Sequence, residues 1–261
     1  MTRPVVLSVA GSDPSGGAGL QADLKVAAAY GVHGAAVPTL LTVQDSRGVR
    51  EVVSLEAGVF RRSLDVVLAD LRPRAVKIGA LASAEVIASL AAALAATDAP
   101  VILDTIVASS SGAPFLDEAA LSVFARELVP RAVLLTPNLV EARLLLGAQE
   151  DDASALADAS FRRFGVPTLV KGGHAEGDRS IDVLVDGEGE ARFDAPRFDG
   201  PSPHGTGCAL SMAIACELAL GGPLREAIRD AKSYVSRAIA RAERLGEGAP
   251  FLDFQASDER G

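Results

Sequence analysis

The sequence alternates regularly between short β-branched runs and longer stretches rich in Ala and Leu. The short runs are mostly apolar, which indicates strands buried on both faces of a sheet. The longer stretches carry apolar residues at helical spacing. Because strand and helix follow one another repeatedly, the pattern predicts an α/β fold whose central sheet is mostly parallel.

The predicted elements cover most of the chain. Strands are expected at residues 5–10, 34–43, 75–79, 101–104, 133–136 and 168–171. Helices are expected at residues 19–30, 55–71, 84–96, 117–128, 138–146, 153–164, 208–220 and 224–245, and a β-hairpin at 181–194. No repeat or linker interrupts the series, so we expect one domain over residues 1–261, with a frayed polar tail at 252–261.

Charge and hydropathy narrow the choice of partners. The chain has 34 acidic and 25 basic residues, a net charge of −9, and its basic residues do not cluster. A nucleic-acid partner needs a concentrated Lys/Arg surface, so we expect none. No apolar run is long enough to span a membrane, and the N-terminus lacks the pattern of a secretory leader. We therefore expect a cytoplasmic protein with no membrane partner.

The two cysteines, Cys208 and Cys216, fall on one predicted helix. Their spacing corresponds to about 12 Å along a helix axis, which is too far for a disulfide. Unpaired thiols fit a reducing compartment. Neither cysteine has a histidine at zinc-binding spacing, so structural zinc is not expected.

A glycine-rich segment, residues 10–19, directly follows the first predicted strand. Glycines let the main chain approach a ligand closely, and the helix that follows offers free N–H groups. A P-loop is excluded because Gly17 stands where Lys is required. The dinucleotide fingerprint matches residues 17–22, with Asp45 as the best substitute for its acidic residue, and a turn without a ligand is the alternative. Asp23 on the next helix fits a ligand contact or a solvated side chain.

A second glycine-rich helix start lies at residues 203–210. Gly205, Thr206 and Gly207 lead into a helix whose first two turns carry no charged residue. Such a start presents several unpaired N–H groups and suits a phosphoryl group in transfer. Cys208 falls at this start, where the pKa of a thiol tends to fall. The alternative is a glycine-rich helix entry in which Cys208 is simply a small buried residue.

Polar residues follow the predicted strands at the ends where an open parallel sheet binds its ligands. Gln44 follows the second strand, and Lys171, before two glycines, ends the sixth. This lysine fits a phosphate contact or a surface side chain that extends into water. Asp104, Asn138 and Glu141 offer oxygen atoms suited to a hydrated Mg²⁺ ion.

Taken in order, these segments resemble the ribokinase-like superfamily, and within it the hydroxymethylpyrimidine and phosphomethylpyrimidine kinases of thiamine biosynthesis. The matching segments are 10–13, 16–25, 41–44, 76–79, 102–104, 136–138, 170–174 and 204–208. The sequences Gly-Gly-Ala-Gly-x-Gln-Ala-Asp and His-Gly-Thr-Gly-Cys are specific to this branch. The resemblance implies a three-layer α/β/α sandwich, a homodimer, and an ATP-dependent kinase that phosphorylates the pyrimidine alcohol and then its monophosphate.

The resemblance also implies a role for each site residue. The residues implied are Gly11, Asp23 and Gln44 for the pyrimidine, Gly205, Thr206, Gly207 and Cys208 for catalysis, Asn138, Glu141 and Lys171 for ATP, and Asp104 and Glu141 for Mg²⁺. Glycines 205 and 207 with Thr206 would form an anion hole. Whether Cys208 acts as a base or only shapes this hole is left open.

Some positions depart from the family pattern. Ala80 replaces a frequent Met, Thr105 a Pro and Ser110 a Lys, which removes ring packing and one basic contact. The nearest alternative is a pyridoxine (vitamin B6) kinase, because that ring also carries a hydroxymethyl group and related enzymes share the His-Gly-Thr-Gly-Cys type of site. Two further alternatives are a dinucleotide-binding oxidoreductase, based on residues 17–22, and a non-catalytic pyrimidine-binding regulator, based on the lysine missing at Ser110.

Overall fold

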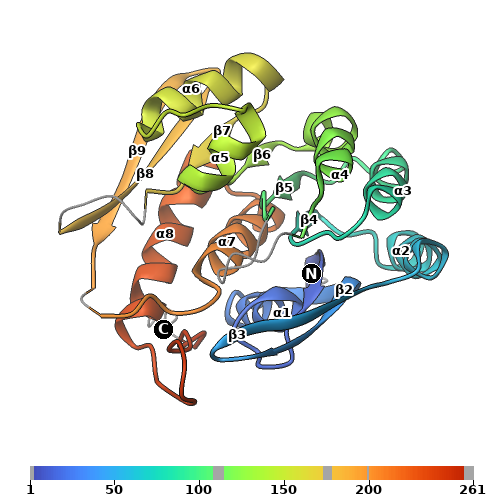
Figure 1. Ribbon diagram of the computed structural model, residues 1–261, viewed down its shortest axis with the longest axis horizontal. Helices are drawn as coiled ribbons and strands as arrows, with labels where there is room; N and C mark the ends of the chain where they lie inside the picture. Colours follow the sequence, from blue (N-terminus) through green and yellow to red (C-terminus); the bar gives the residue numbers. More distant parts are fainter. Residues whose placement is uncertain (1–2, 108–114, 173–177, 199, 256–261) are drawn as a thin grey trace.

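The computed structural model describes residues 3–107, 115–172, 178–198 and 200–255. Its centre is a nine-stranded sheet with the order β3-β2-β1-β4-β5-β6-β7-β8-β9 (Figure 1). The six strands from β2 to β7 in this order run parallel, whereas β3, β8 and β9 pair antiparallel at the edges. The strands are β1 Val5–Ser12, β2 His33–Asp45, β3 Gly48–Ser54, β4 Ala75–Ile78, β5 Val101–Leu103, β6 Leu134–Leu135, β7 Thr168–Val170, β8 Arg179–Asp186 and β9 Gly189–Pro196.

Helices cover both faces of this sheet, which confirms the predicted three-layer α/β/α sandwich. One face packs against α1, α7 and α8, and the other packs mainly against the helices from α2 to α5. The helices are α1 Gly19–Ala29, α2 Ala57–Leu71, α3 Ala84–Leu94, α4 Glu118–Val123, α5 Leu139–Leu146, α6 Ala153–Phe164, α7 Thr206–Leu220 and α8 Leu224–Ala240. None of the helices in the described ranges is long and apolar enough to cross a bilayer.

The central strands are mostly apolar because both of their faces are covered. In β4, Ala75 packs under α1 and α7, whereas its neighbours Val76 and Ile78 pack under α2 and α3. This alternation is the period of two expected of a strand. Lys77 therefore points into the layer of α1 and α7, where it is fully buried. A buried ammonium there requires a partner.

The order of the strands places a crevice beside β1. β1 lies between β2 and β4, so the chain leaves β1 toward one edge of the sheet and later returns to its other side. Open α/β sheets bind ligands at such a switch point, beyond the carboxyl ends of the strands. The glycine-rich segment, residues 10–19, begins at this end of β1 and runs into α1.

The outer strand β3 was not predicted, and the prediction that β2 is buried on both faces is wrong for its second half. Leu41 and Val43 of β2 are 48% and 50% exposed, and Val53 of β3 is 46% exposed. Residues 41–54 form a two-stranded ribbon with an uncovered face. The sequence of β3, GVREVVS, mixes charged and apolar residues and so lacks the apolar run of the central strands.

Two predicted helices differ in extent. The helix expected at residues 117–128 is α4 followed by a π-helical turn, η1 Phe124–Leu128, and a short 3₁₀ turn, η2 Val129–Arg131. The helix expected to reach residue 245 ends at Ala240. Beyond it, Glu243 and Phe251 exchange main-chain hydrogen bonds of 2.9 and 2.8 Å, which turns the chain back on itself.

The chain after α8 is ordered, so the prediction of a frayed tail is wrong for residues 252–255. Leu252 and Phe254 are buried, and the Tyr234 hydroxyl donates a hydrogen bond to the Phe254 carbonyl. Residues 256–261 lie outside the described residues. The segment 241–251, here called the C-terminal loop, contacts the β2–β3 turn, since Ala249 N–H donates to the carbonyl of Ser46 at 2.8 Å.

Candidate active site

The two glycine-rich helix starts lie against each other in one crevice. A Cβ atom on Gly205 would lie 1.9 Å from the carbonyl oxygen of Gly17. α1 begins at Gly19 and α7 begins at Thr206, directly after Gly205. Gly19 and Gly205 have φ angles of 56° and 83°, in the left-handed region that favours glycine. Both helices therefore direct their free N–H groups toward the same region.

The thiol of Cys208 lies where these helix starts meet. Cys208 belongs to the first turn of α7, and the N–H of Gly19 in α1 acts to lower the pKa of its thiol. Burial raises the pKa of this thiol to about 11, although the ammonium of Lys77 acts in the opposite direction. The expectation that the helix start lowers this pKa is therefore wrong. Lost hydration of the thiolate outweighs the favourable dipole.

Asp13 organises the first glycine-rich turn. Its Oδ1 accepts hydrogen bonds from the N–H and the hydroxyl of Ser15, at 2.9 and 2.7 Å. Its Oδ2 accepts from the N–H groups of Gly17 and Ala18, at 3.2 and 2.8 Å. Burial alone would raise the pKa of Asp13, but hydrogen bonds from His204, Ser15 and Ala18 together hold it below its ordinary value. Asp13 was not among the predicted site residues.

Gln44 lies at the end of β2 and contacts the approach to α7. The side-chain amide of Gln44 lies 2.6 Å from Nε2 of His204. The same His204 nitrogen lies 3.3 Å from Oδ2 of Asp13. A chain of polar contacts therefore runs from the predicted ring-binding residue to the first glycine-rich turn. His204 joins the two ends of this chain and was matched only as part of a motif.

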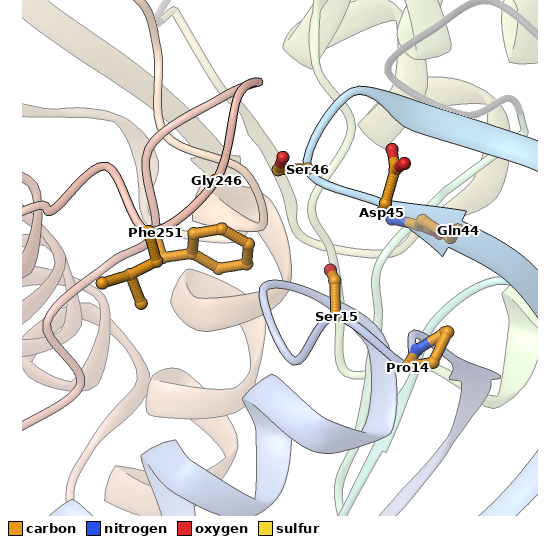
Figure 2. A pocket seen from close by; sticks show the side chains of 8 residues that line it. Pro14, Ser15, Gln44, Asp45, Ser46, Gly246 and Phe251 are labelled. Atoms are coloured by element: carbon orange, nitrogen blue, oxygen red, sulfur yellow. The ribbon is translucent and has the colours of Figure 1, made fainter.

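A cavity of about 340 Å³ opens beside Gln44 (Figure 2). Its lining residues are Pro14, Ser15, Gln44, Asp45, Ser46, Leu245, Gly246 and Phe251. Neither Cys208 nor any of the glycines predicted to be catalytic is among them, so the cavity does not contain the helix starts. Asp45 lies in the β2–β3 turn, where it pairs with Arg47 and Arg50. A carboxylate held in this way does not fit the ribose-binding acid of a dinucleotide site.

Gly11 lies at the other wall of the crevice, near the end of β1. A Cβ on Gly11 would lie 2.7 Å from Cδ1 of Leu40 and 3.7 Å from Cβ of Ala80. The carbonyl of Ala80 in turn accepts a hydrogen bond from the Thr39 hydroxyl at 2.6 Å. Gly11 is thus surrounded by small and apolar groups. Its contact with a bound ring stays a prediction.

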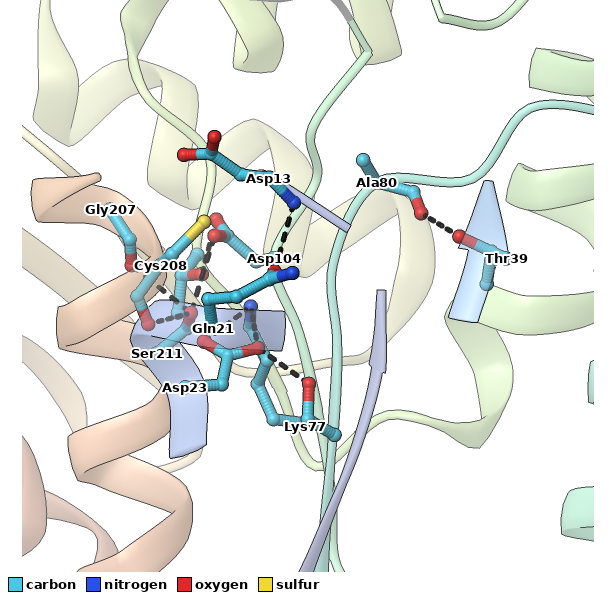
Figure 3. A network of polar contacts seen from close by, with 12 residues as sticks. Asp13, Gln21, Asp23, Thr39, Lys77, Ala80, Asp104, Gly207, Cys208 and Ser211 are labelled. Carbon is cyan, nitrogen blue, oxygen red and sulfur yellow. Dashed lines mark hydrogen bonds and ion pairs between the residues drawn. The ribbon is translucent and has the colours of Figure 1, made fainter. Parts of the chain in front are cut away.

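Asp23 and Lys77 form a buried ion pair below Cys208 (Figure 3). The Lys77 ammonium lies 2.8 Å from Oδ2 of Asp23, and both side chains are 0% exposed. The Ser8 hydroxyl donates a further hydrogen bond to the same oxygen. Burial would lower the pKa of Lys77, but the carboxylates of Asp23 and Asp104 raise it above its ordinary value. Asp23 neutralises Lys77 in this structure, and its contact with the ring stays a prediction.

Lys171 gathers the predicted anion-binding residues next to α7. Its ammonium lies 2.8 Å from Oδ1 of Asp104 and 3.9 Å from Oε2 of Glu141. The same ammonium lies 3.1 Å from the position of a Cβ on Gly207. Burial would lower the pKa of Lys171, but these two carboxylates raise it above its ordinary value. The helix start and one buried cation therefore face the same space.

Asn138 positions Glu141 through a capping box at the start of α5. The Asn138 side chain accepts from the N–H of Glu141 at 2.9 Å, and Oε2 of Glu141 accepts from the N–H of Asn138 at 2.7 Å. Asn138 also lies beside Lys171 as a parallel bridge. Burial raises the pKa of Glu141 to about 7, against the effect of Lys171. The contact of Asn138 with a nucleotide stays a prediction.

The donor set around Lys171 fits a magnesium ion that arrives with a nucleotide. Magnesium in phosphoryl-transfer sites takes one or two carboxylates and completes its shell with phosphates and water. Asp104 and Glu141 supply such carboxylates, and the buried residue Thr105 directly follows Asp104 in the sequence. No cluster of three or more His, Cys, Asp or Glu side chains forms a metal cage in the described ranges.

Comparison with known proteins identifies relatives over almost the whole chain. The model of the phosphomethylpyrimidine kinase family matches residues 13–253. The hydroxymethylpyrimidine/phosphomethylpyrimidine kinase of Streptomyces coelicolor is 44% identical over 256 residues, which cover 97% of this chain and 95% of the relative. The enzyme of the same name from Escherichia coli is 39% identical over 253 residues and covers 95% of each chain.

Solved structures show the same fold. The pyridoxal kinase of Staphylococcus aureus in complex with AMP-PCP has a TM-score of 0.90 and 28% identity, over 100% of this chain and 96% of that one. The phosphomethylpyrimidine kinase of Clostridium difficile has a TM-score of 0.79 and 33% identity, over 91% of this chain and 100% of that one. On its sequence and its site, the chain belongs to the phosphomethylpyrimidine kinase family.

Proposed function

We propose that this protein is an ATP-dependent kinase of thiamine biosynthesis that phosphorylates the hydroxymethyl group of 4-amino-5-hydroxymethyl-2-methylpyrimidine and then its monophosphate. The main support is the meeting of the starts of α1 and α7 at Cys208, with the Lys171 ammonium 3.1 Å from a Cβ position on Gly207. This arrangement offers N–H groups and a cation to one anionic group. Curated relatives that match almost the whole chain carry the same activity in their names.

In this proposal the protein acts by positioning and by neutralising charge. Phosphoryl transfer needs the hydroxyl in line with the γ-phosphate and donors for the charge on its oxygens. The N–H groups at Thr206, Gly207 and Cys208 start α7 without a side-chain cap and are available as those donors. Lys171 adds a cation next to Gly207. A bound Mg²⁺ ion, held by Asp104 and Glu141, supplies further neutralisation of the phosphates.

We propose that Cys208 shapes the anion hole and does not remove the proton from the hydroxyl. A pKa of about 11 leaves the thiol protonated at neutral pH. A thiolate would also add negative charge beside an incoming phosphate, which burial and the carboxylates of Asp104 and Asp23 oppose. As a neutral thiol, Cys208 is small enough to keep the two helix starts close together.

The substrate is the point on which two candidate activities differ. Curated relatives at 39 to 44% identity are named pyrimidine kinases, whereas the pyridoxal kinase structures are 28 to 29% identical. We therefore favour the pyrimidine alcohol. Vitamin B6 alcohols remain the second candidate, since the Staphylococcus aureus kinase with pyridoxal shares the whole fold.

We also propose a cytoplasmic homodimer. The uncovered face of the β2–β3 ribbon supports the dimer, because Leu41, Val43 and Val53 are about half exposed and lie together on it. Two such faces would cover each other. Light scattering should give a dimer mass for the wild type and a monomer mass for Val53→Asp. A monomeric wild type at micromolar concentration would contradict the dimer.

The test of the proposed function is a coupled assay with Mg-ATP that follows ADP formation. The substrates are the pyrimidine alcohol, its monophosphate and pyridoxine, measured side by side. We expect turnover on both pyrimidines and weaker turnover on pyridoxine. The Gly207→Asp variant should lose turnover but keep pyrimidine binding, because a new carboxylate would occupy the space beside Lys171. Absence of phosphate transfer by the wild type would favour the non-catalytic regulator, and preference for pyridoxine would favour the second candidate.

A further inference from the structure

The Gln44 amide lies between two polar groups that determine its orientation. One end of the amide lies 2.6 Å from Nε2 of His204. The other end lies 3.1 Å from the hydroxyl of Thr42. An amide nitrogen and oxygen are nearly isosteric, so hydrogen bonding decides which atom occupies which end. Only one of the two orientations of the Gln44 amide places a donor opposite every acceptor around it.

The decisive neighbour is Asp13. This carboxylate is 3% exposed and accepts hydrogen bonds from main-chain N–H groups and from Ser15, which keep it ionised. Its Oδ2 lies 3.3 Å from Nε2 of His204. An anion facing a nitrogen lone pair is unfavourable, whereas an anion facing an N–H group is favourable. His204 therefore carries a proton on Nε2.

A proton on Nε2 of His204 fixes the Gln44 amide. Asp13 and the amide atom 2.6 Å away share this one proton, so the amide atom must be an acceptor, the carbonyl oxygen Oε1, and the NH₂ group lies at the Thr42 end. The Thr42 hydroxyl donates its own proton to the carbonyl of Ser12 at 2.9 Å and retains a lone pair for one amide N–H. The second amide N–H is left without a partner in this network.

We propose that the Asp13–His204 pair is a positioning device that holds the NH₂ group of Gln44 toward the bound ring. The proposal rests on the proposed function, in which Gln44 binds the ring. It specifies the chemistry of the ring edge that Gln44 contacts: that edge presents a hydrogen-bond acceptor, which in a heteroaromatic ring is an unprotonated ring nitrogen. His204 precedes Gly205, so one residue links ring recognition to the start of α7.

The first experiment observes the proton directly and needs no substrate. Nitrogen-15 NMR of the wild type, with imidazole-labelled histidine, distinguishes a protonated Nε2 from an unprotonated one. The chain has 3 histidines, and the His204→Gln variant identifies the signals of His204. We expect a proton on Nε2 at pH 7. A neutral imidazole with its proton only on Nδ1 would overturn the proposal.

The second experiment measures equilibrium binding of the pyrimidine alcohol by calorimetry, without ATP. Gln44→Glu replaces the NH₂ group with a second acceptor, and we expect its dissociation constant to rise by about tenfold or more. His204→Phe removes the donor and should weaken binding similarly. His204→Gln keeps a donor near the same position and should retain most of the affinity. Gln44→Glu that binds as tightly as the wild type would mean that Oε1 faces the ring, and would overturn the proposal.

A third measurement separates positioning from a merely structural role. The ligands are two pyridine analogues of the pyrimidine alcohol, each with one ring nitrogen replaced by CH. The analogue that lacks the ring nitrogen facing Gln44 should bind the wild type about tenfold or more weakly than the other analogue does. In His204→Phe, the two analogues should bind equally well. An equal difference in both proteins would overturn the proposal. Phosphate transfer by the wild type is assayed in parallel. Its absence would contradict the proposed function, whereas the NMR experiment tests the proton on His204 independently of that function.

Discussion

Gly205 packs on Gly17 so closely that a methyl group on Gly205 would lie 1.9 Å from the Gly17 carbonyl oxygen. This contact joins segments that lie far apart in the sequence, at the start of α1 and the start of α7. No side chain can stand between them. The distance between the two helix starts is therefore set by the main chain itself, which makes glycine at residue 205 a requirement of the site.

Gly205→Ala is expected to reduce turnover by about 100-fold or more, because the added methyl group must push the two helix starts apart. The matched control is Gly221→Ala at the other end of α7. Gly221 also has a positive φ, of 97°, but no atom lies within 4 Å of its Cβ position. The control therefore carries only the backbone strain, about 1–2 kcal/mol. Steady-state kinetics and urea unfolding of both variants test this, and equal turnover in the two would contradict it.

Lys171→Met should lower kcat by on the order of 100-fold while leaving the KM of the pyrimidine nearly unchanged. The reason is that its ammonium faces Gly207 and not Gln44. Lys232→Met is the control, since Lys232 lies 2.7 Å from the buried Asp182 just as Lys171 lies 2.8 Å from Asp104. Lys171→Met leaves Asp104 and Glu141 without this cation, and Lys232→Met leaves Asp182 without its cation, so both variants should lose stability. A similar loss of kcat in Lys232→Met would show that stability alone explains the effect.

Removing one member of the buried Asp23–Lys77 pair should destabilise the fold strongly. Lys77→Met leaves the Asp23 carboxylate buried without its cation, at a cost of about 3–5 kcal/mol in the free energy of unfolding. The double variant Lys77→Met/Asp23→Asn should recover part of this loss. Arg61→Ala, which breaks the exposed pair with Asp65, should cost less than about 1 kcal/mol. Urea unfolding measures all three, and a small loss in Lys77→Met would contradict the assigned burial.

The Cys208 thiol predicts a loss of stability in alkali. Its pKa rises from 9.0 to about 11 on folding, so the folded state holds this proton more tightly than the unfolded state. The contribution is fully present below pH 9 and is lost as the pH rises through the folded value of about 11. Between pH 9 and about 11, the free energy of unfolding should fall by about 2–3 kcal/mol less in Cys208→Ala than in the wild type. Identical pH profiles in chemical unfolding would contradict a buried, protonated thiol.

The central sheet and most helices were predictable because their signal is local. Apolar runs such as the one in β5 persist only where both faces are covered, and α6 begins and ends within the range that its periodicity indicated. The ribbon strand β3 escaped prediction because half of its surface faces water. The end of α8 depends on the pairing of Glu243 with Phe251, which no local pattern encodes.

The residues of the candidate site also fall into two groups, those whose role the sequence predicts and those whose role it does not. The glycines at 17, 205 and 207 were predictable, since their spacing before a helix has a direct meaning for the main chain. The roles of Asp13, His204 and Lys77 were not, because each depends on a partner that is distant in sequence. Cys208 is the clearest failure: its position in α7 favoured a lowered pKa, but its burial raises it.

The C-terminal loop connects the ring-binding side of the site to a segment outside the central sheet. This loop holds the turn beside Gln44 through Ser46, and it holds His204, whose N–H donates to the carbonyl of Pro250 at 3.0 Å. These contacts come from residues outside the strands and helices of the sheet, so the sheet can form without them. We expect a chain truncated after Ala240 to keep most of its circular dichroism spectrum but to bind no pyrimidine alcohol, because the contacts that hold the β2–β3 turn and His204 are then missing.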